Sequence, residues 1–371
     1  MRGFQSISCL LSALLFARAA LCAGLPDPFS LLSGNVVVVH GFGGSQLVNA
    51  QNETVWLTEA EATGAQPINI ALPIDIVGPT PTGIRPVGFL TNEPWNPFYT
   101  DFITKLQSLD TQGQISLHLL YYDFRRENTL ASQDLFALLQ NIRQTTGHPS
   151  LVFAHSMGSV ITMHALVSNK VKSDVISGIV FAGGPFNGNI QGVVQQKTST
   201  FPFLLRSSWN FPPFDGQGVV IKGSASDKPV LDFSKPDVWT KNNLSLALAT
   251  STPDIATSAQ KAAYLQRTLD FATQIRNAQY FSRSIVYPPI VAICSKAHDT
   301  PGTVNATRNA DGTVEILPQE VNPIPGDGVV AWNSCMPRSR VPYKLVESTA
   351  VHMLLLNDFD AVGKAIKVVT K

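Results

Sequence analysis

Segments with the pattern of buried strands alternate with segments of helical spacing along the first half of the chain. Residues 35–40 form a β-branched run that ends in a glycine-rich loop, and such continuous apolar texture is typical of a buried parallel strand. The alternation continues as helix 97–109, strand 115–122, helix 130–145, strand 150–154, helix 156–167 and strand 176–182. This alternation predicts βαβ units around a mostly parallel sheet, with helices on both faces.

The alternation stops near residue 187. Residues 187–285 contain clusters of aromatic residues and proline around Trp209, Phe211 and Phe214, and a helical stretch over residues 259–278. The region is therefore predicted to be an insertion rather than another βα unit. Its aromatic side chains either touch lipid or belong to a core.

Two further segments complete the predicted architecture. Strand texture returns over residues 289–294, and a last helix follows His352. Residues 50–97 are rich in Pro, Gly and Thr and predict a long irregular excursion. Excursions of this length tend to carry function rather than merely connect elements.

The first residues have the pattern of an export signal. Arg2 precedes an apolar run over residues 7–16, and small residues then follow as far as Ala23. The run is shorter than the roughly 18 residues that a membrane-spanning helix needs. We therefore expect a signal peptide over residues 1–23, a mature chain over residues 24–371, and secretion or residence in the lumen of the secretory pathway.

Composition excludes several classes of function. Apolar residues make up 44% of the 371 residues and charged residues 14%, which favours a globular protein with a large core. The 27 Lys and Arg residues almost balance the 26 Asp and Glu residues. Because the chain has no basic field, the sequence does not predict a nucleic-acid partner.

The cysteines and the glycosylation motifs agree with export. Removal of the signal peptide leaves Cys294 and Cys335, and two cysteines in an oxidising compartment suggest one disulfide. Three Asn-x-Ser/Thr motifs are candidate glycosylation sites, and they begin at Asn52, Asn243 and Asn305.

The segment around Ser156 carries the most chemical information. An apolar strand runs into Ala154-His155-Ser156-Met157-Gly158 and then directly into a helix. This order fits the nucleophile elbow of α/β-hydrolases, in which a sharp turn frees the serine oxygen and small neighbours let strand and helix approach. Ser156 is therefore the candidate nucleophile.

A serine nucleophile needs a general base that is itself held by an acid, and in this fold the chain order is Ser, acid, His. His352 lies just before the last predicted helix and is the better base, with His298 as the alternative. Asp327 lies in a Gly-Asp-Gly turn ahead of His352. Asp299 competes with Asp327, and the chain order favours Asp327.

The candidate oxyanion donors are two backbone N–H groups. In this fold one belongs to the residue after the nucleophile and the other to the loop after an early strand, which gives Met157 and Phe42. The glycine loop at residues 41–44 lacks the spacing of nucleotide-binding loops. The histidines and cysteines show no metal-ligand spacing, so neither a metal nor another cofactor is expected.

Five segments, in this order, resemble motifs of the lecithin:cholesterol acyltransferase family, which includes lysosomal phospholipase A2 and phospholipid:diacylglycerol acyltransferases. The segments are Gly41-Phe42-Gly43-Gly44-Ser45-Gln46-Leu47, Tyr122-Asp123-Phe124-Arg125, Ala154-His155-Ser156-Met157-Gly158, Gly183-Gly184-Pro185-Phe186-Asn187-Gly188 and Gly326-Asp327-Gly328-Val329-Val330. His352 falls where the family has its triad histidine.

The resemblance implies an α/β-hydrolase core with a cap over residues 187–285, and serine acyl-enzyme chemistry on a lipid acyl donor. It implies the same roles for Ser156, Asp327, His352, Phe42 and Met157, and a pairing between Cys294 and Cys335. It also implies that Asp123 and Arg125 form a buried polar pair that supports the elbow. The animal members have a second disulfide early in the chain, and this sequence has no cysteine between Ala23 and Ala292 to form it.

These observations lead to one functional hypothesis with two rivals. We expect a secreted lipid acyltransferase or phospholipase that acts transiently at a lipid interface and passes the acyl group to water or an alcohol. The closest rival is a secreted triacylglycerol lipase or thioesterase with the same three residues. A catalytically silent lipid-binding protein would require a broken triad, and none of its elements is missing from the sequence.

Overall fold

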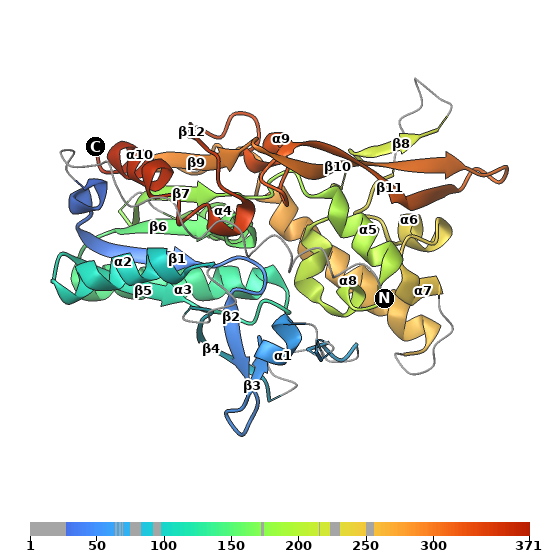
Figure 1. Cartoon of the computed structure of the whole chain (residues 1–371), viewed down its shortest axis with the longest axis horizontal. Helices are drawn as coiled ribbons and strands as arrows, with labels where there is room; N and C mark the ends of the chain where they lie inside the picture. Colours follow the sequence, from blue (N-terminus) through green and yellow to red (C-terminus); the bar gives the residue numbers. More distant parts are fainter. Residues whose placement is uncertain are drawn as a thin grey trace.

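The computed structural model describes residues 27–63, 65–66, 68, 70–74, 83–91, 98–171, 174–214, 216–222, 231–249 and 256–371. The predicted signal peptide therefore lies outside the described residues. Figure 1 shows a helix-flanked sheet on one side of the molecule, and a second group of helices with a long β-ribbon on the other.

The centre of the fold is a six-stranded sheet in the order β12-β9-β7-β6-β1-β5. Every neighbouring pair of these strands is parallel. The strands are β1 (Gly34–Val39), β5 (Ile115–Leu120), β6 (Ser150–His155), β7 (Ile176–Ala182), β9 (Ile290–Ser295) and β12 (Lys344–Ser348). The prediction of a mostly parallel sheet is confirmed, and only β12 had not been singled out from the sequence.

Helices cover both faces of the sheet, as predicted. Alternate residues of β1 point to opposite faces, so Val36 and Val38 lie in one apolar cluster while Val37 and Val39 lie in the other. On the first face lie α2 (Thr100–Thr111) and α10 (Phe359–Val369), and on the second lie α3 (Asn128–Thr146) and α4 (Met157–Ser168). Helix α8 (Ser258–Asn277) packs outside α3 and α4, which explains why α4 is buried almost all round.

The excursion after β1 is less irregular than expected. In its described part, β3 and β4 pair in antiparallel fashion with β2, which lies just before residue 50, and one short helix follows β3. These elements are β2 (Ser45–Val48), α1 (Glu59–Ala62), β3 (Thr54–Trp56) and β4 (Arg85–Phe89). Strands of three to five residues are too short to display a clear alternation, which is why the sequence pattern missed them.

The insertion has a core of its own. Its elements are α5 (Ile190–Thr198), η2 (Pro202–Leu204), η3 (Arg206–Asn210), β8 (Val219–Ile221), α6 (Pro236–Lys241), α7 (Leu246–Ala249) and α8. Trp209 is fully buried there, with its ring centroid 4.8 Å from that of Trp239. Of the aromatic residues that were expected either to touch lipid or to pack in a core, Trp209 therefore belongs to the core, while Phe211 and Phe214 are half-buried.

A β-ribbon completes the insertion's core and was not predicted. Strands β10 (His298–Arg308) and β11 (Val314–Gly326) pair in antiparallel fashion, and β8 joins them along the other edge of β10. Val304 and Ile316 of the ribbon pack in the same apolar cluster as Trp209. Prolines scattered through both strands hide the ribbon from a sequence pattern, and register shifts accommodate some of them. The remaining short elements are η1 (Pro28–Leu31), α9 (Trp332–Cys335) and η4 (His352–Leu354).

Candidate active site

Ser156 lies at the sharp turn between β6 and α4, as the elbow pattern predicts. Its backbone has φ 52° and ψ −124°, a conformation that is costly for a residue with a Cβ atom. The turn is held because Ser156 N–H donates to the Ala182 carbonyl over 2.8 Å. A Cβ atom on Gly158 would lie 2.5 Å from the His40 carbonyl oxygen, so the crossing of helix and strand requires glycine there.

The structure brings Ser156, His352 and Asp327 together in one hydrogen-bonded series. His352 Nε2 lies 2.8 Å from Ser156 Oγ, and His352 Nδ1 lies 2.8 Å from Asp327 Oδ2. The three residues are buried, and they come from the loops after β6, β11 and β12. Ser156 and His352 follow parallel strands of the central sheet, whose carboxyl edge is where α/β folds place their ligands. Asp327 comes instead from the end of the antiparallel ribbon, where it bridges to His298 of β10.

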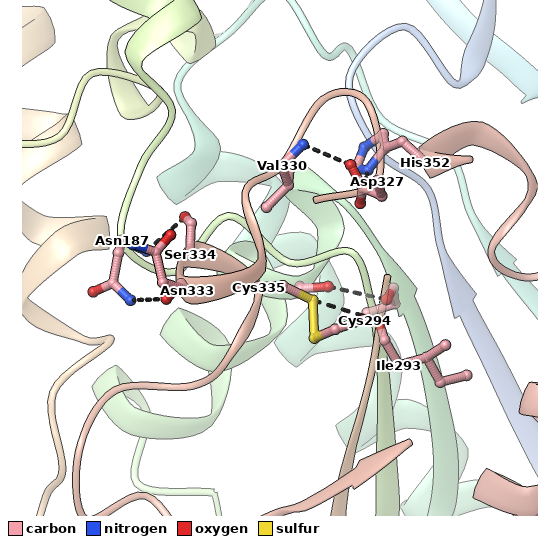
Figure 2. The surroundings of a disulfide bond; sticks show 11 residues. Asn187, Ile293, Cys294, Asp327, Val330, Asn333, Ser334, Cys335 and His352 are labelled. Carbon is pink, nitrogen blue, oxygen red and sulfur yellow. Dashed lines mark hydrogen bonds and ion pairs between the residues drawn. A yellow bond between two sulfur atoms is a disulfide. The ribbon is translucent and has the colours of Figure 1, made fainter. Parts of the chain in front are cut away.

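Asp327 is held firmly on the side away from the serine. Its Oδ1 accepts the backbone N–H groups of Val329 and Val330, the latter drawn in Figure 2. Its carbonyl accepts the His352 N–H over 2.8 Å. Burial by itself would raise the pKa of Asp327. The attraction of His352, with the hydrogen bonds from His352, Val330 and Val329, outweighs burial and keeps the pKa below its ordinary value. The carboxylate therefore stays ionised beside the imidazole.

The alternative base and acid do not reach the serine. His298 Nε2 bonds the Thr349 carbonyl over 2.8 Å, and Asp299 is exposed on β10. The chain order that favoured Asp327 and His352 thus selected the two side chains that the fold places next to Ser156.

The loop after β1 forms a tight turn beside the serine. Gly44 N–H donates to the Gly41 carbonyl over 3.2 Å, and Gly43 has φ 74°, as a type II turn requires at its third position. A Cβ atom on Gly41 would lie 2.7 Å from Ser156 Cβ, so the loop touches the elbow. The N–H groups of Phe42 and Met157 have no hydrogen-bond partner within the described part of the chain.

Several buried polar residues around these loops were not singled out from the sequence. His40 Nδ1 lies 2.7 Å from the Gly41 carbonyl, and its ring stacks on Tyr122 with centroids 4.1 Å apart. Burial lowers the pKa of His40 to about 4. Tyr99 and His155 form a second group, described below. Apolar sequence around each of these residues gave a weak signal of burial but no indication of their partners.

Arg125 is buried and pairs with the partly buried Asp123, and a role of this pair in supporting the elbow stays a prediction. Arg125 donates to both carboxylate oxygens of Asp123, and its guanidinium also reaches the Ile70 carbonyl. The Arg125 carbonyl accepts the Arg206 N–H over 2.8 Å. The pair therefore joins the excursion and the insertion to the core.

The predicted disulfide is present and ties the end of β9 to α9. Cys294 and Cys335 have Cα atoms 5.9 Å apart. Figure 2 shows it next to the loop that carries Asp327. Beside it, Ser334 and Asn333 accept hydrogen bonds from Asn187, where the insertion begins.

The glycosylation candidates differ in exposure. Asn52 and Asn243 are exposed, whereas Asn305 lies half-buried on β10 with its amide donating to Glu320 over 2.9 Å. Within the described ranges, no group of three His, Cys, Asp or Glu residues is arranged to hold a metal ion. None of the described helices is both long and apolar enough to cross a membrane.

Comparison with solved structures supports the fold. A chain from the Tle4-Tli4 complex superimposes with a TM-score of 0.60 at 10% identity, covering 90% of this chain and 99% of that one. A soluble variant of monoglyceride lipase from Saccharomyces cerevisiae gives 0.38 at 14% identity, covering 92% and 88%. Monoacylglycerol lipase from Paleococcus ferrophilus gives 0.37 at 12%, covering 91% and 95%. Identities this low bear on the fold alone, and only the first superposition, with a TM-score above 0.5, supports it.

Comparison of sequences identifies the family that the chain resembles. No curated protein matches the chain. The family profile described as lecithin:cholesterol acyltransferase matches residues 80–199, a segment that contains Tyr122, Ser156 and Gly183 but neither Asp327 nor His352. The match supports a lipid acyltransferase or ester hydrolase. The resemblance to the lecithin:cholesterol acyltransferase family is thereby confirmed over residues 80–199.

Proposed function

We propose that the protein is a serine-dependent lipid acyltransferase or phospholipase that works through an acyl-enzyme at Ser156. The observation that carries the proposal is the continuous hydrogen-bonded series from Asp327 through His352 to Ser156. His352 lies 25 positions after Asp327 and 196 positions after Ser156, so the fold brings together residues that are far apart in the sequence. A buried series of this kind is what a weak nucleophile needs in order to lose its proton at the moment of attack.

The chemistry follows from the roles of these groups. Ser156 Oγ attacks the ester carbonyl while its proton passes to His352 Nε2, and ionised Asp327 stabilises the imidazolium at Nδ1. The N–H groups of Phe42 and Met157 receive the developing oxyanion. His352 then protonates the leaving alcohol, and the acyl-enzyme remains. Water or a second alcohol attacks it, with His352 again as base.

The surroundings of the oxyanion loop favour an apolar acyl chain. The Phe42 ring packs edge-on against Phe124 and Phe211, at centroid distances of 5.1 and 5.6 Å. Trp56 packs on Phe124 and donates its indole N–H to the Gly43 carbonyl over 2.9 Å. This aromatic group contains side chains of the core, the excursion and the insertion. We propose that it contacts the acyl chain of a phospholipid-type ester.

Residues 187–285 are proposed to act as the cap of this site. Two contacts of the insertion support this role. Phe211 packs on Phe42 of the oxyanion loop, and Asn189 Nδ2 donates to the Val329 carbonyl in the loop of the proposed acid. A movement of the insertion would therefore displace the oxyanion loop through Phe211 and the loop of Asp327 through Asn189.

We further propose that the protein matures in the secretory pathway and acts at a lipid interface outside the cytosol. The predicted signal peptide and the disulfide between Cys294 and Cys335 support an oxidising compartment. Expression in a secreting host, followed by N-terminal sequencing and glycosidase treatment, tests this. Retention of residues 1–23 in the mature protein, with no mass change on deglycosylation, would contradict it.

Product analysis tests the proposed activity. The purified protein and its Ser156→Ala variant are incubated with phospholipid vesicles that contain a sterol, and lipid products are quantified. Free fatty acid alone, made only with Ser156 present, indicates a phospholipase, and an esterified sterol indicates an acyltransferase. Cleavage of triacylglycerols or thioesters without either product would contradict the proposal and favour the lipase or thioesterase. Equal amounts of product from the parent protein and from Ser156→Ala would contradict the assignment of Ser156 as the nucleophile.

A further inference from the structure

Tyr99 and His155 connect the three loops of the proposed active site. Gly41 N–H donates to the Tyr99 hydroxyl over 2.9 Å, and that hydroxyl lies 2.8 Å from His155 Nδ1. His155 Nε2 lies 2.9 Å from the backbone carbonyl of His352. Tyr99 and His155 are each only 2% exposed. The four residues form one continuous buried chain of hydrogen bonds.

The direction of every bond in this chain is fixed by its two ends. A backbone N–H only donates, so the Tyr99 oxygen accepts from Gly41 and its own hydrogen is free to point at His155 Nδ1. A backbone carbonyl only accepts, so His155 Nε2 carries the proton that reaches His352. A neutral His155 therefore carries its proton on Nε2, because the other neutral tautomer would leave the bond to the His352 carbonyl unmade.

The surroundings keep both groups in these protonation states. Burial, followed by the nearby charge of His352, lowers the pKa of His155 to about 3. Burial also raises the pKa of Tyr99 far above its ordinary value. Neither group therefore titrates near neutral pH, and the chain keeps its polarity over the range in which an esterase works.

The chain lies where small displacements matter for the reaction. Gly41 precedes the proposed oxyanion donor Phe42, and His155 precedes Ser156. His352 is held on both sides of its backbone, because its N–H donates to the Asp327 carbonyl over 2.8 Å and its carbonyl accepts from His155. Tyr99 caps α2, so it reaches these loops from an element that carries none of the proposed catalytic residues.

We propose that Tyr99 and His155 are positioning residues that fix the oxyanion loop, the nucleophile and the base relative to one another. The inference rests on the proposed function through Ser156 and His352 alone, and it does not depend on which lipid is the substrate. Their contribution is geometric, because an oxyanion donor or base that moves by a fraction of an ångström loses its advantage in the transition state.

Labelling by a fluorophosphonate ester tests this without any lipid. The reaction needs Ser156 Oγ to bond to phosphorus while fluoride leaves and His352 takes the serine proton. The maximal labelling rate and the half-saturating concentration are measured for the parent protein, Tyr99→Phe, and a control, Tyr264→Phe. The control removes a hydroxyl that is equally buried but lies in the core of the insertion.

We expect Tyr99→Phe to lower the maximal rate about tenfold while the half-saturating concentration changes less than about twofold, and the control to match the parent. Rates are counted per labelled site, so partial misfolding cannot mimic the effect. A parental rate in Tyr99→Phe would overturn the proposal. So would an equal loss in Tyr264→Phe, because buried tyrosine hydroxyls would then matter for general structural reasons.

A double-mutant cycle supplies the second measurement. His155→Gln removes the imidazole in the middle of the chain, and the proposal predicts that His155→Gln with Tyr99→Phe loses little more than the larger single loss. Multiplying losses would mean two independent structural effects and would overturn the proposal. If the parent labels at Ser156 but acts on no lipid ester, the proposed function fails while this inference stands. If the parent does not label, both fail.

Discussion

Two regions of this molecule bury their side chains in different ways. At the carboxyl edge of the parallel sheet the buried residues are polar, and hydrogen bonds link Tyr99, His155, His352 and Asp327 into one network. In the insertion the largest buried side chains are aromatic and pack on one another, as Trp239 does on Trp209. Hydrogen bonds depend on direction and distance, whereas apolar packing depends mainly on area and volume.

The difference predicts two separable kinds of damage. A polar change at the sheet edge should impair the reaction more than the fold, because the surrounding loops are held by several bonds each. A truncated aromatic residue in the insertion should lower the free energy of unfolding more than it lowers the rate. The substitutions below test whether the two regions differ in this way.

The largest effect is expected from Asp327→Asn. The amide cannot stabilise the imidazolium of His352, so kcat per active site should fall about 10⁴-fold while thermal stability changes little. Initial rates on a chromogenic ester, with sites counted by titration, measure this. The matched control is Asp299→Asn, since Asp299 was the alternative acid and is exposed away from Ser156. If both variants lose the same activity, Asp327 has no special role.

The opposite behaviour is expected from Trp239→Ala. Its indole is fully buried and donates to the Phe233 carbonyl over 2.9 Å, so truncation should cost about 3–5 kcal/mol of unfolding free energy. Urea denaturation measures the cost, and kcat per folded site should stay within about threefold of the parent. Trp239→Phe serves if the alanine variant does not fold. A large fall in kcat without a stability loss would remove the contrast between the regions.

The disulfide belongs to neither kind of buried region, because it lies at the sheet edge but forms no hydrogen bond to Ser156. Cys294→Ala with Cys335→Ala opens a loop with a sequence separation of 41 residues. Chain entropy predicts a loss of about 3–4 kcal/mol of unfolding free energy. Calorimetry of the double variant measures the loss. Unchanged stability with impaired turnover would show that the bond acts on the reaction instead.

The smallest effect on the reaction is expected for a histidine that changes only how stability depends on pH. Burial lowers the pKa of His40, His155 and His164 from 6.5 to about 4, 3 and 4, so in acid the unfolded chain binds protons that the folded chain does not. Stability is therefore complete above about pH 6.5 and falls as the pH drops towards 4. Each histidine contributes up to about 1.4 kcal/mol per pH unit.

His164 separates this effect from the reaction. It bonds Ser132 between α3 and α4, outside the network of the sheet edge. His164→Gln should flatten the fall of unfolding free energy between pH 6.5 and 4, and should leave kcat at pH 7 unchanged. Denaturant titrations at several pH values measure the slope. An unaltered slope would mean that this histidine is not protonated on unfolding in that range.

The sequence also predicted the structure of the parallel-sheet core better than that of the insertion and its ribbon. The βα alternation located the strands and helices of the core within a few residues, since each buried strand is a continuous apolar run. Chain order selected Asp327 over Asp299. The ribbon β10–β11 escaped because its prolines and polar residues break the strand pattern, and Trp209 was ambiguous because an aromatic cluster looks alike in a core and at a lipid surface.

Contacts between distant residues were beyond any local pattern. The hydroxyl of Tyr99 and the ring of His155 are 56 positions apart, and the ring of His155 meets the His352 carbonyl 197 positions away. A motif specifies what its own residues do, and in this protein it predicted the turn that presents Ser156, the proposed nucleophile. The partners that position the motif depend on how strand ends meet, which only the assembled sheet determines.

The most direct test of the account is to locate the acyl group on the enzyme. The protein is mixed with a rapidly acylating ester, quenched in acid within the first turnover, digested and examined by peptide mass mapping. We predict that the acyl mass lies on Ser156 and is absent from the Ser156→Ala variant, which also loses turnover. An acyl group on another residue, or undiminished turnover in Ser156→Ala, would contradict the account.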